Sequence, residues 1–527
     1  MAALTTSLFD EGAPEPCPRA FNAAAYCLSN SAKTHPDKTA LIVVSDPQSL
    51  EPAERWSFAQ LDDAVRRLAA GLTHMGLQPG ERVMLRLGNH SSFPLIFFAT
   101  LAAGAIAVPT SSQLTKREAR FIADDCGARF ICTSSDLKLD DVVEGCTQLL
   151  DDDIRDLMGC EDLAEYAHTH ADDPAYIVYT SGATSHPKGV LHAHRAVWAR
   201  RMMFEGWYAI SETDRMLHAG AFNWTYTLGA GLMDPWAVGA CTVIYNGEKD
   251  PSVWPRLADK HQATLFAAVP SLYRQMLKYA DHIGEGFARL RHGLTAGEKL
   301  SESVRENWQN VTAKPLFEAL GMSECSTYAS SSPTVAVKPG FTGRPQIGRR
   351  VAILSFDESS TDTVAIGEPG LLALHKDDPG LMLGYWNQDA QTQAAFRGDW
   401  FLTGDLALLD EDGYLQYQGR ADDLMNAQGY RVSPQDIEDV LVHHSDVHEC
   451  ACAEIRVRED LSIIGAFIVA HEGTKVSAPD LTAYASERLA AYKVPKQFIF
   501  VEALPHSATG KVLRRELPAL FEKIKQA

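Results

Sequence analysis

The sequence predicts an α/β protein of layered sheets that is followed by a smaller C-terminal domain. Helical and strand patterns alternate through about the first 400 residues, and this alternation favours sheets covered by helices. The pattern changes at Gly413, where a hairpin-like segment runs to Gly419 and leads into a domain-sized remainder. The chain has 527 residues, 46% hydrophobic and 22% charged, which excludes disordered, collagenous and coiled-coil classes. We therefore predict two domains, residues 1–421 and 422–527, with the boundary at Asp422.

Periodicity and capping signals predict the individual elements in chain order. Residues 57–74 are expected to form an amphipathic helix that begins with Ser57 and Gln60 as a capping box. The apolar stretch 93–108 is interrupted by a proline and a glycine and is shorter than the roughly 18 to 20 residues that span a bilayer, so it predicts a buried helix and then a strand. The other expected elements are strands at 82–87 and 129–132, a helix at 116–126 and an exposed loop at the acidic run 151–153.

The charge balance argues against polyanionic partners. Acidic residues outnumber basic ones by 68 to 48, so we expect no nucleic acid and no membrane among the partners. The first 18 residues carry acids but no Lys or Arg, which argues against a secretory signal or a mitochondrial presequence. The ten cysteines include no Cys-x-x-Cys pair, and Cys450 and Cys452 lack the usual spacing of a zinc site. Reduced thiols and a cytoplasmic location are the expectation.

A loop of small and hydroxylated residues is predicted within 176–190, which reads Tyr-Ile-Val-Tyr-Thr-Ser-Gly-Ala-Thr-Ser-His-Pro-Lys-Gly-Val. Small residues let backbone N–H groups approach phosphate oxygens, and hydroxyl and ammonium groups add donors. The candidate phosphate-binding residues are Thr180, Ser181, Gly182, Thr184 and Lys188. Taken alone, the loop could equally be an ordinary surface loop. A Walker loop does not fit because the lysine precedes the glycine, and a β-lactamase Ser-x-x-Lys motif lacks its companion signatures.

This loop resembles the signature of the adenylate-forming superfamily, which includes acyl-CoA synthetases, firefly-type luciferases and adenylation domains of peptide synthetases. Six further stretches match in order along nearly the whole chain: Thr-Ala-Gly-Glu-Lys at 295–299, Gly-Met-Ser-Glu at 321–324, Thr-Gly-Asp-Leu at 403–406, Gly-Arg-Ala-Asp-Asp at 419–423, Gly-Tyr-Arg-Val at 429–432 and Gly-Lys-Val-Leu-Arg-Arg at 510–515. Each stretch alone could be a turn, a helix cap or a solvated tail, but six in sequence make coincidence improbable.

The resemblance implies a ligase that activates a carboxylic acid with ATP, forms an acyl-adenylate and pyrophosphate, and then transfers the acyl group to CoA. It implies that Lys511 is catalytic between the carboxylate and the α-phosphate, that Arg431 approaches the phosphate, and that Glu324 binds Mg²⁺. Asp405 and Arg420 resemble the ribose contacts. The remaining implied nucleotide contacts are Ser323 and the two adenine walls, Gly297, Glu298 and Lys299 on one side and Glu318, Ala319 and Leu320 on the other.

The resemblance also implies a small mobile α+β lid as the second domain. Asp422 is the implied hinge, and Gly429 is expected beside the channel for the pantetheine arm of CoA, where a side chain would obstruct passage. The phosphate loop departs from the family pattern, because Ala183 replaces a Thr and Ser185 replaces a Gly. We expect the loop to stay functional with one hydroxyl donor fewer.

The acyl pocket is the part of the site that the motifs specify least. Acetate-activating relatives place a bulky aromatic residue where this chain has Gly321, so we expect room for a larger acid. Phe222 and Trp224 are the other candidate pocket residues, and their surroundings resemble medium-chain and benzoate-type CoA ligases. The substrate expected is therefore a medium-chain or aromatic carboxylic acid. The alternatives are loading of a separate carrier protein, luciferase chemistry, or a non-catalytic nucleotide-binding protein on the same fold; a homodimer is possible.

Overall fold

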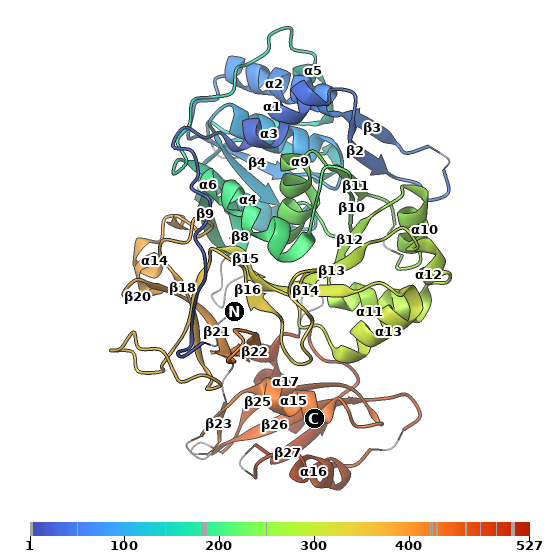
Figure 1. Cartoon of the computed structure of the whole chain (residues 1–527), viewed down its shortest axis with the longest axis vertical. Helices are drawn as coiled ribbons and strands as arrows, with labels where there is room; N and C mark the ends of the chain where they lie inside the picture. Colours follow the sequence, from blue (N-terminus) through green and yellow to red (C-terminus); the bar gives the residue numbers. More distant parts are fainter. Residues whose placement is uncertain are drawn as a thin grey trace. The chain divides into compact units, whose positions relative to one another are not determined.

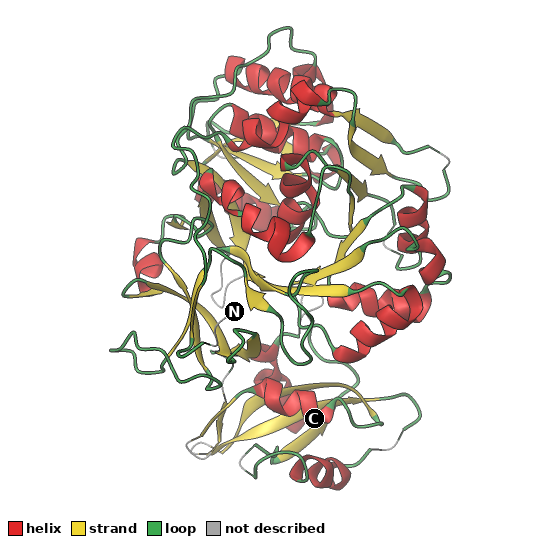
Figure 2. Ribbon diagram, in the orientation of Figure 1, coloured by secondary structure: helices red, strands yellow, loops and turns green. Residues whose placement is uncertain are grey.

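Strands of buried, β-branched residues form the sheets of this protein. The computed structural model describes residues 4–49, 51–142, 144–180, 187–248, 250–421, 423, 425–427, 430–458, 461–474, 476–491, 493–506 and 512–526. The chain divides into two compact units. The larger comprises residues 9–350 and 374–401, and the smaller comprises residues 1–8, 351–373 and 402–527. Figures 1 and 2 show helices and sheets in both units, which confirms the predicted α/β class.

The larger unit contains a nine-stranded sheet whose central strands run parallel. Runs such as Thr-Ala-Leu-Ile-Val-Val in β2 are almost wholly buried, as is typical of strands covered on both faces. The order is β16 (Arg344–Pro345), β15 (Ser326–Ser330), β14 (Leu316–Met322), β13 (His292–Ala296), β12 (Leu265–Ala268), β10 (Arg215–His218), β11 (Cys241–Tyr245), β2 (Thr39–Val44) and β3 (Glu54–Ser57). The outer pairs β14–β15, β15–β16 and β2–β3 are antiparallel.

A second, seven-stranded sheet carries the strands on either side of the predicted phosphate loop. Its order is β19 (Gly384–Tyr385), β9 (Lys188–Ala193), β8 (Pro174–Thr180), β5 (Ile106–Thr110), β4 (Arg82–Arg86), β6 (Ala128–Thr133) and β7 (Thr147–Leu149). The strands predicted at 82–87 and 129–132 are confirmed as β4 and β6. The antiparallel pair β8–β9 places Thr180 opposite Lys188, so the phosphate loop connects adjacent strand ends.

The helices α1 (Ala23–Thr34), α2 (Phe58–His74) and α3 (Ser92–Ala102) pack side by side against buried strand residues (Figure 1). The predicted capping box is confirmed, because the Gln60 N–H donates to Ser57 Oγ and the Ser57 N–H donates to Gln60 Oε1. The buried helix followed by a strand at 93–108 is confirmed by α3 and β5, and the helix at 116–126 is confirmed as α4 (Lys116–Cys126).

The loop expected at 151–153 is wrong: these residues form the first turn of α5 (Asp151–Met158). Carboxylates are favourable at a helix N-terminus because the first N–H groups are unpaired, and the Asp153 carboxylate accepts a hydrogen bond from the Leu150 N–H at 2.9 Å. The remaining helical segments of the larger unit are α6 (Arg195–Ala199), α7 (Arg201–Met203), η2 (Phe204–Tyr208), α8 (Thr225–Leu228), η3 (Gly229–Met233), α9 (Asp234–Ala237), α10 (Val253–Lys260), α11 (Pro270–Tyr279), α12 (Ile283–Gly286), α13 (Glu302–Thr312) and α14 (Asp389–Ala394), with a short η1 (Ser135–Leu137). Both η2 and η3 are π-helical turns.

The smaller unit contains short antiparallel strands and a three-stranded sheet with helices. The hairpin expected at 413–419 is formed by β21 (Trp400–Leu409) and β22 (Leu415–Arg420), so its turn lies slightly earlier than predicted. The C-terminal sheet has the order β25 (Val447–Arg458), β26 (Leu461–Ala470) and β27 (Gln497–Phe500). The other elements are β1 (Leu8–Asp10), β17 (Arg350–Leu354), β18 (Gly370–His375), β23 (Met425–Ala427), β24 (Tyr430–Val432), α15 (Pro434–Leu441), α16 (Ala478–Ser486), η4 (Arg514–Glu516) and α17 (Leu517–Gln526). The short strand β20 (Phe396–Arg397), which pairs with β21, belongs to the larger unit.

Asp422 lies outside the described residues, and the domain boundary there stays a prediction. Within the described part of the chain, no helix combines the length and the apolar character that crossing a bilayer requires.

Candidate active site

Lys188 and Glu324 are brought together in the larger unit by a tyrosine between them. The Lys188 ammonium lies over the Tyr385 ring, 5.3 Å from its centre, and the Tyr385 hydroxyl donates to Glu324 Oε1 at 2.9 Å. Three elements supply these residues: β9 carries Lys188, β19 carries Tyr385, and the turn between β14 and β15 carries Glu324. The side chains thus place a cation and a carboxylate at the start of β9, the strand that follows the predicted phosphate loop in the sequence.

Tyr385 was not among the predicted site residues, since 61 positions separate it from Glu324 and no local motif links them. Its place follows from strand pairing, because β19 pairs with β9 and sets Tyr385 opposite Val190. The aromatic residue after Gly384 was the only signal in the sequence. Ser181, Gly182 and Thr184 lie outside the described residues, as do the departures Ala183 and Ser185.

Glu324 fits a magnesium ion that is shared with nucleotide phosphates. Mg²⁺ is commonly bound by one or two carboxylates together with phosphate oxygens and waters. Among the described residues, no group of three or more His, Cys, Asp or Glu side chains could enclose a metal ion by itself. The half-buried Glu324 carboxylate is therefore suited to a metal whose other ligands come with the nucleotide.

A buried histidine contacts the backbone of Ser323. His192 Nε2 lies 2.8 Å from the Ser323 carbonyl oxygen, and the Ser323 and Thr225 hydroxyls are 3.5 Å apart. Burial lowers the pKa of His192 to about 4, so the ring is neutral at neutral pH and donates its Nε2 proton to the carbonyl. A cavity of about 10 Å³, room for roughly one water molecule, lies beside this ring and is also lined by Tyr176 and Arg200. His192 was missed by sequence reasoning.

The two predicted adenine walls are adjacent at the carboxyl ends of parallel strands. Residues 297–299 follow β13, residues 318–320 belong to β14, and Ala296 pairs with Ala319. The two glutamate side chains make internal bonds. Glu298 accepts from the Ser271 N–H and hydroxyl, both at 3.1 Å, at the start of α11, while Glu318 is buried. Lys299 is exposed and Leu320 is half-buried.

The buried Glu318 carboxyl should make stability depend on pH. It accepts from the Leu300 N–H at 2.9 Å and from Arg305 Nη2 at 3.2 Å, yet burial raises its pKa from 4.5 to about 7. The folded state then binds this proton more tightly than the unfolded state, so stability is lost as pH rises from about 4.5 to 7. We expect Glu318→Gln to gain stability relative to the parent chain over this range, by no more than about 3 kcal/mol, in urea unfolding at a series of pH values. A constant difference across the range would contradict this.

The neighbouring strand leaves no room for a side chain at Gly321. A Cβ at this position would lie 2.5 Å from the Ser326 carbonyl oxygen and 2.6 Å from Thr327 Cα. The crowded backbone by itself accounts for a glycine at this position, and the expectation that Gly321 opens space for a larger acid stays a prediction. The register of β14 and β15 shifts at this point.

We expect Gly321→Ala to destabilise the protein by about 1–3 kcal/mol, because the added methyl group has no room and the strands must separate. The free energy of unfolding in urea measures the effect. Unchanged stability together with an altered acid preference would instead support the pocket interpretation.

The aromatic residues predicted for the acyl pocket have different surroundings. Phe222 is buried, stacks on Phe93 with ring centres 5.4 Å apart, and belongs to the hydrophobic core. Its N–H donates to Asn89 Oδ1 at 3.1 Å. Trp224 is half-buried and precedes α8. Phe222 therefore acts in packing, and Trp224 remains a candidate for substrate contact.

The two predicted ribose contacts meet in the smaller unit. Asp405 on β21 pairs directly with Arg420 on β22, and Arg420 Nη1 donates to Asp405 Oδ1 at 3.2 Å and to the Thr403 carbonyl oxygen at 3.1 Å. Gly404 permits this approach, since a Cβ there would lie 2.5 Å from Arg420 Nη2 and its φ is +75°. The arrangement keeps a buried carboxylate acceptor beside a cation.

Four predicted residues lie wholly or partly outside the described part of the chain. Arg431 belongs to β24, but its side chain is not described, and Asp422, Gly429 and Lys511 lie outside the described residues. Their predicted roles stay predictions.

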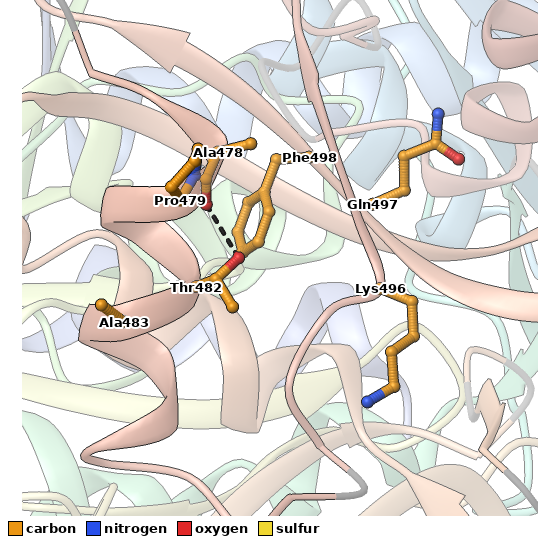
Figure 3. A pocket seen from close by; sticks show the side chains of 7 residues that line it. All are labelled: Ala478, Pro479, Thr482, Ala483, Lys496, Gln497 and Phe498. Carbon is orange, nitrogen blue, oxygen red and sulfur yellow. Dashed lines mark hydrogen bonds between the residues drawn. The ribbon is translucent and has the colours of Figure 1, made fainter.

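A surface hollow of about 580 Å³ lies between α16 and β27 in the smaller unit (Figure 3). Its lining is largely apolar, and the Thr482 hydroxyl donates to the Ala478 carbonyl oxygen at 2.8 Å. The lining residues are Ala478, Pro479, Thr482, Ala483, Lys496, Gln497 and Phe498, and they include none of the predicted site residues.

The chain is similar to known CoA ligases along most of its length. It is 32% identical over 492 residues to a benzoate–CoA ligase from Thauera aromatica, covering 89% of this chain and 91% of that protein. It is 28% identical over 498 residues to a 3-hydroxybenzoate–CoA ligase from Aromatoleum sp. (strain CIB), covering 91% and 94%. The structure of the anthranilate CoA ligase AuaEII in complex with anthranoyl-AMP superposes with a TM-score of 0.85 at 26% identity, covering 97% of this chain and 99% of that one.

Family models agree with these similarities. Residues 28–386 match the AMP-binding enzyme model, and residues 436–511 match the model of the AMP-binding enzyme C-terminal domain. The resemblance to adenylate-forming enzymes is thereby confirmed. The chain belongs to the AMP-binding enzyme family.

Proposed function

We propose that this protein activates an aromatic carboxylic acid with ATP and transfers the acyl group to CoA. The acid's carboxylate attacks the α-phosphate of ATP, releasing pyrophosphate and forming an acyl-adenylate. The thiol of CoA then attacks the acyl carbon, and AMP leaves as the thioester forms. The benzoate and 3-hydroxybenzoate ligases among the relatives support the aromatic class over a medium-chain acid.

The observation that carries this proposal is the convergence of Lys188, Tyr385 and Glu324 at the start of β9. Two anions must meet in the first step, so the site needs positive charge and oriented donors where negative charge develops. Lys188 supplies a cation at the loop, and Glu324 would hold Mg²⁺ against the phosphate oxygens. When bound, the metal would neutralise part of the polyphosphate charge. Tyr385 orients the Glu324 carboxylate through its hydroxyl.

The nucleoside contacts follow the same reasoning. The Asp405 carboxylate can accept protons from both ribose hydroxyls, and Arg420 holds that carboxylate in one orientation. The backbone of residues 297–299 and 318–320 offers two neighbouring segments for the adenine ring. Lys511 and Arg431 would supply the remaining cations for the adenylation step, with Asp422 as hinge and Gly429 beside the pantetheine channel.

A panel of carboxylates assayed for AMP release, with and without CoA, tests the proposal. We expect benzoate-type acids to give CoA-dependent AMP release and a thioester product. Adenylate formation without transfer to CoA would indicate a carrier protein as acceptor, and absence of ATP-dependent chemistry with every acid would indicate a non-catalytic nucleotide-binding protein. Light emission with luciferin and oxygen would identify luciferase chemistry. A cytoplasmic location and a homodimer are further predictions of the sequence.

A further inference from the structure

The turn that carries Glu324 is contacted at five consecutive positions, by buried side chains at four of them and by a backbone N–H at Glu324. It connects β14 to β15, the strands labelled near the middle of Figure 1. His192 bonds the Ser323 carbonyl oxygen from one side, and the Met382 N–H donates to the Glu324 carbonyl oxygen at 2.8 Å. The next three residues, Cys325, Ser326 and Thr327, are each contacted by a buried arginine.

The first arginine belongs to a buried ion pair under Ser326. Arg200 donates from Nε and Nη2 to the two carboxylate oxygens of Asp234, both at 2.7 Å, and the Tyr208 hydroxyl donates to the same carboxylate at 2.9 Å. The remaining nitrogen, Nη1, donates to Ser326 Oγ. A Cβ at Gly229, in the π-helical turn η3, would lie 1.9 Å from this guanidinium. The Arg200 guanidinium therefore occupies the space that a side chain at position 229 would need.

The second arginine holds the two residues on either side of Ser326. Arg349 is 1% exposed and donates from Nη1 to Asp378 Oδ1 at 2.5 Å and to Cys325 Sγ at 3.2 Å. Its Nη2 donates to the Thr327 carbonyl oxygen at 2.9 Å. The Gly380 N–H donates to the same Asp378 oxygen at 2.8 Å, which fixes the carboxylate in turn.

The turn is strained, which explains why it needs such support. Ser326 has a φ of +65°, a left-handed conformation that is uncommon for residues other than glycine. Strained residues persist where their surroundings determine the conformation, and they concentrate at functional sites. Burial of two Arg–Asp pairs is also costly, so both features favour a role beyond simple packing.

We propose that Arg200 and Arg349, each fixed by its aspartate, are positioning residues that hold the Glu324 turn in the geometry needed to bind the metal–nucleotide complex. This inference rests on the proposed function. Neither arginine reaches Glu324 itself: both act through Cys325, Ser326 and Thr327. Outer partners of metal ligands act in this way, by fixing the direction of the ligand.

The test removes one side-chain atom at a time and keeps both arginines and both aspartates. The Cys325 thiol also donates to Asp378 Oδ1 at 3.6 Å, a bond that serine can make as well. Cys325→Ala removes the sulfur that accepts from Arg349, and Ser326→Ala removes the oxygen that accepts from Arg200. Cys325→Ser restores an acceptor and is the conservative rescue. Cys241→Ala is the matched control, because Cys241 is a buried cysteine of β11 whose thiol donates to the Thr242 carbonyl oxygen at 3.7 Å.

Two measurements separate positioning from stability. ATP affinity is measured by calorimetry with Mg²⁺ and with EDTA, and hydrogen exchange is measured at the amides of residues 323–327 without nucleotide. We expect the Mg²⁺-dependent increase in ATP affinity to be about tenfold smaller in both alanine variants than in the parent chain, while the affinity in EDTA is unchanged. The amides of residues 323–327 should exchange hydrogen faster in both variants. Cys325→Ser and Cys241→Ala should match the parent chain in both measurements.

The outcomes distinguish the two proposals. If the parent chain gains ATP affinity from Mg²⁺ and both alanine variants keep that gain, the positioning role is overturned and the proposed function stands. If a variant loses ATP affinity equally with Mg²⁺ and with EDTA, the side chain supports the fold in general and the positioning role is again overturned. If the parent chain binds no ATP under either condition, the proposed function falls, and the role of the arginines in metal binding falls with it.

Discussion

Glu324→Gln is expected to lower adenylate formation by about 100-fold or more, a loss of roughly 2.7 kcal/mol of transition-state stabilisation. The amide keeps an oxygen that can accept from the Tyr385 hydroxyl, so the turn and its contacts are retained. It removes the negative charge that a divalent cation requires of its protein ligand. The rate of ATP–pyrophosphate exchange, measured over a range of Mg²⁺ concentrations with a benzoate-type acid, checks the prediction.

The matched control for this substitution is Glu118→Gln. Glu118 is exposed and completes the capping box of α4 with Thr115, a place where glutamine serves as well as glutamate. We expect this variant to exchange pyrophosphate at the parent rate. A Glu324→Gln enzyme that stays fully active at limiting Mg²⁺ would remove Glu324 from the metal site.

Local signals in the sequence were sufficient for elements whose boundaries are set by neighbouring residues. Ser57 and Gln60 marked the start of α2, because the two side chains satisfy N–H groups within one helical turn. The acidic run at 151–153 was misinterpreted, since three adjacent charges predict solvent exposure as a loop or as a helix N-terminus. Charge alone does not distinguish these two structures.

Motifs located the candidate site, but contacts between distant residues determine its geometry. Asp405 and Arg420 lie 15 positions apart, and the hairpin that joins them was visible in the sequence. Tyr385 and Glu324, or His192 and Ser323 at 131 positions apart, meet only through the order of strands in two sheets. No spacing rule predicts such pairs.

The glycine at 321 shows a different limit. A glycine in a sequence indicates that a side chain is disfavoured, and an empty pocket and a crowded backbone both have this effect. Family resemblance favoured the pocket, and the separation of 2.5 Å between a Cβ at this position and the Ser326 carbonyl oxygen adds the crowded backbone as a second reason. Sequence alone could not reveal this second reason, because it depends on how β14 and β15 pair.

Lys511→Ala is expected to separate the two half-reactions. Adenylate formation should fall by about 10²- to 10³-fold, because the resemblance to adenylate-forming enzymes assigns this cation to the meeting point of the carboxylate and the α-phosphate. Thioester formation from a supplied acyl-adenylate and CoA should stay within about threefold of the parent rate, since that step transfers an acyl group already activated. ATP–pyrophosphate exchange and CoA-dependent AMP release from the supplied adenylate measure the two steps.

The described residues on either side of Lys511 support the use of alanine in this test. His506 and Val512 form an antiparallel bridge, and the Leu513 N–H donates to the Pro505 carbonyl oxygen at 2.8 Å. Arg514 Nη2 lies 2.5 Å from Glu438 Oε2. None of these contacts uses the lysine side chain, and the unfolding temperature of the variant is measured beside the two rates.

Lys496→Ala provides the matched control, because Lys496 is an exposed lysine of the same unit that lies away from the family motifs. Both half-reactions should proceed at the parent rate in that variant. Adenylation that survives in Lys511→Ala would show that another cation neutralises the reacting anions, and Lys188 would then be the first to examine because it already lies beside Tyr385. Equal loss of both half-reactions would instead indicate that Lys511 supports binding of the adenylate itself, since a residue needed only to bring two anions together has no function once they have reacted.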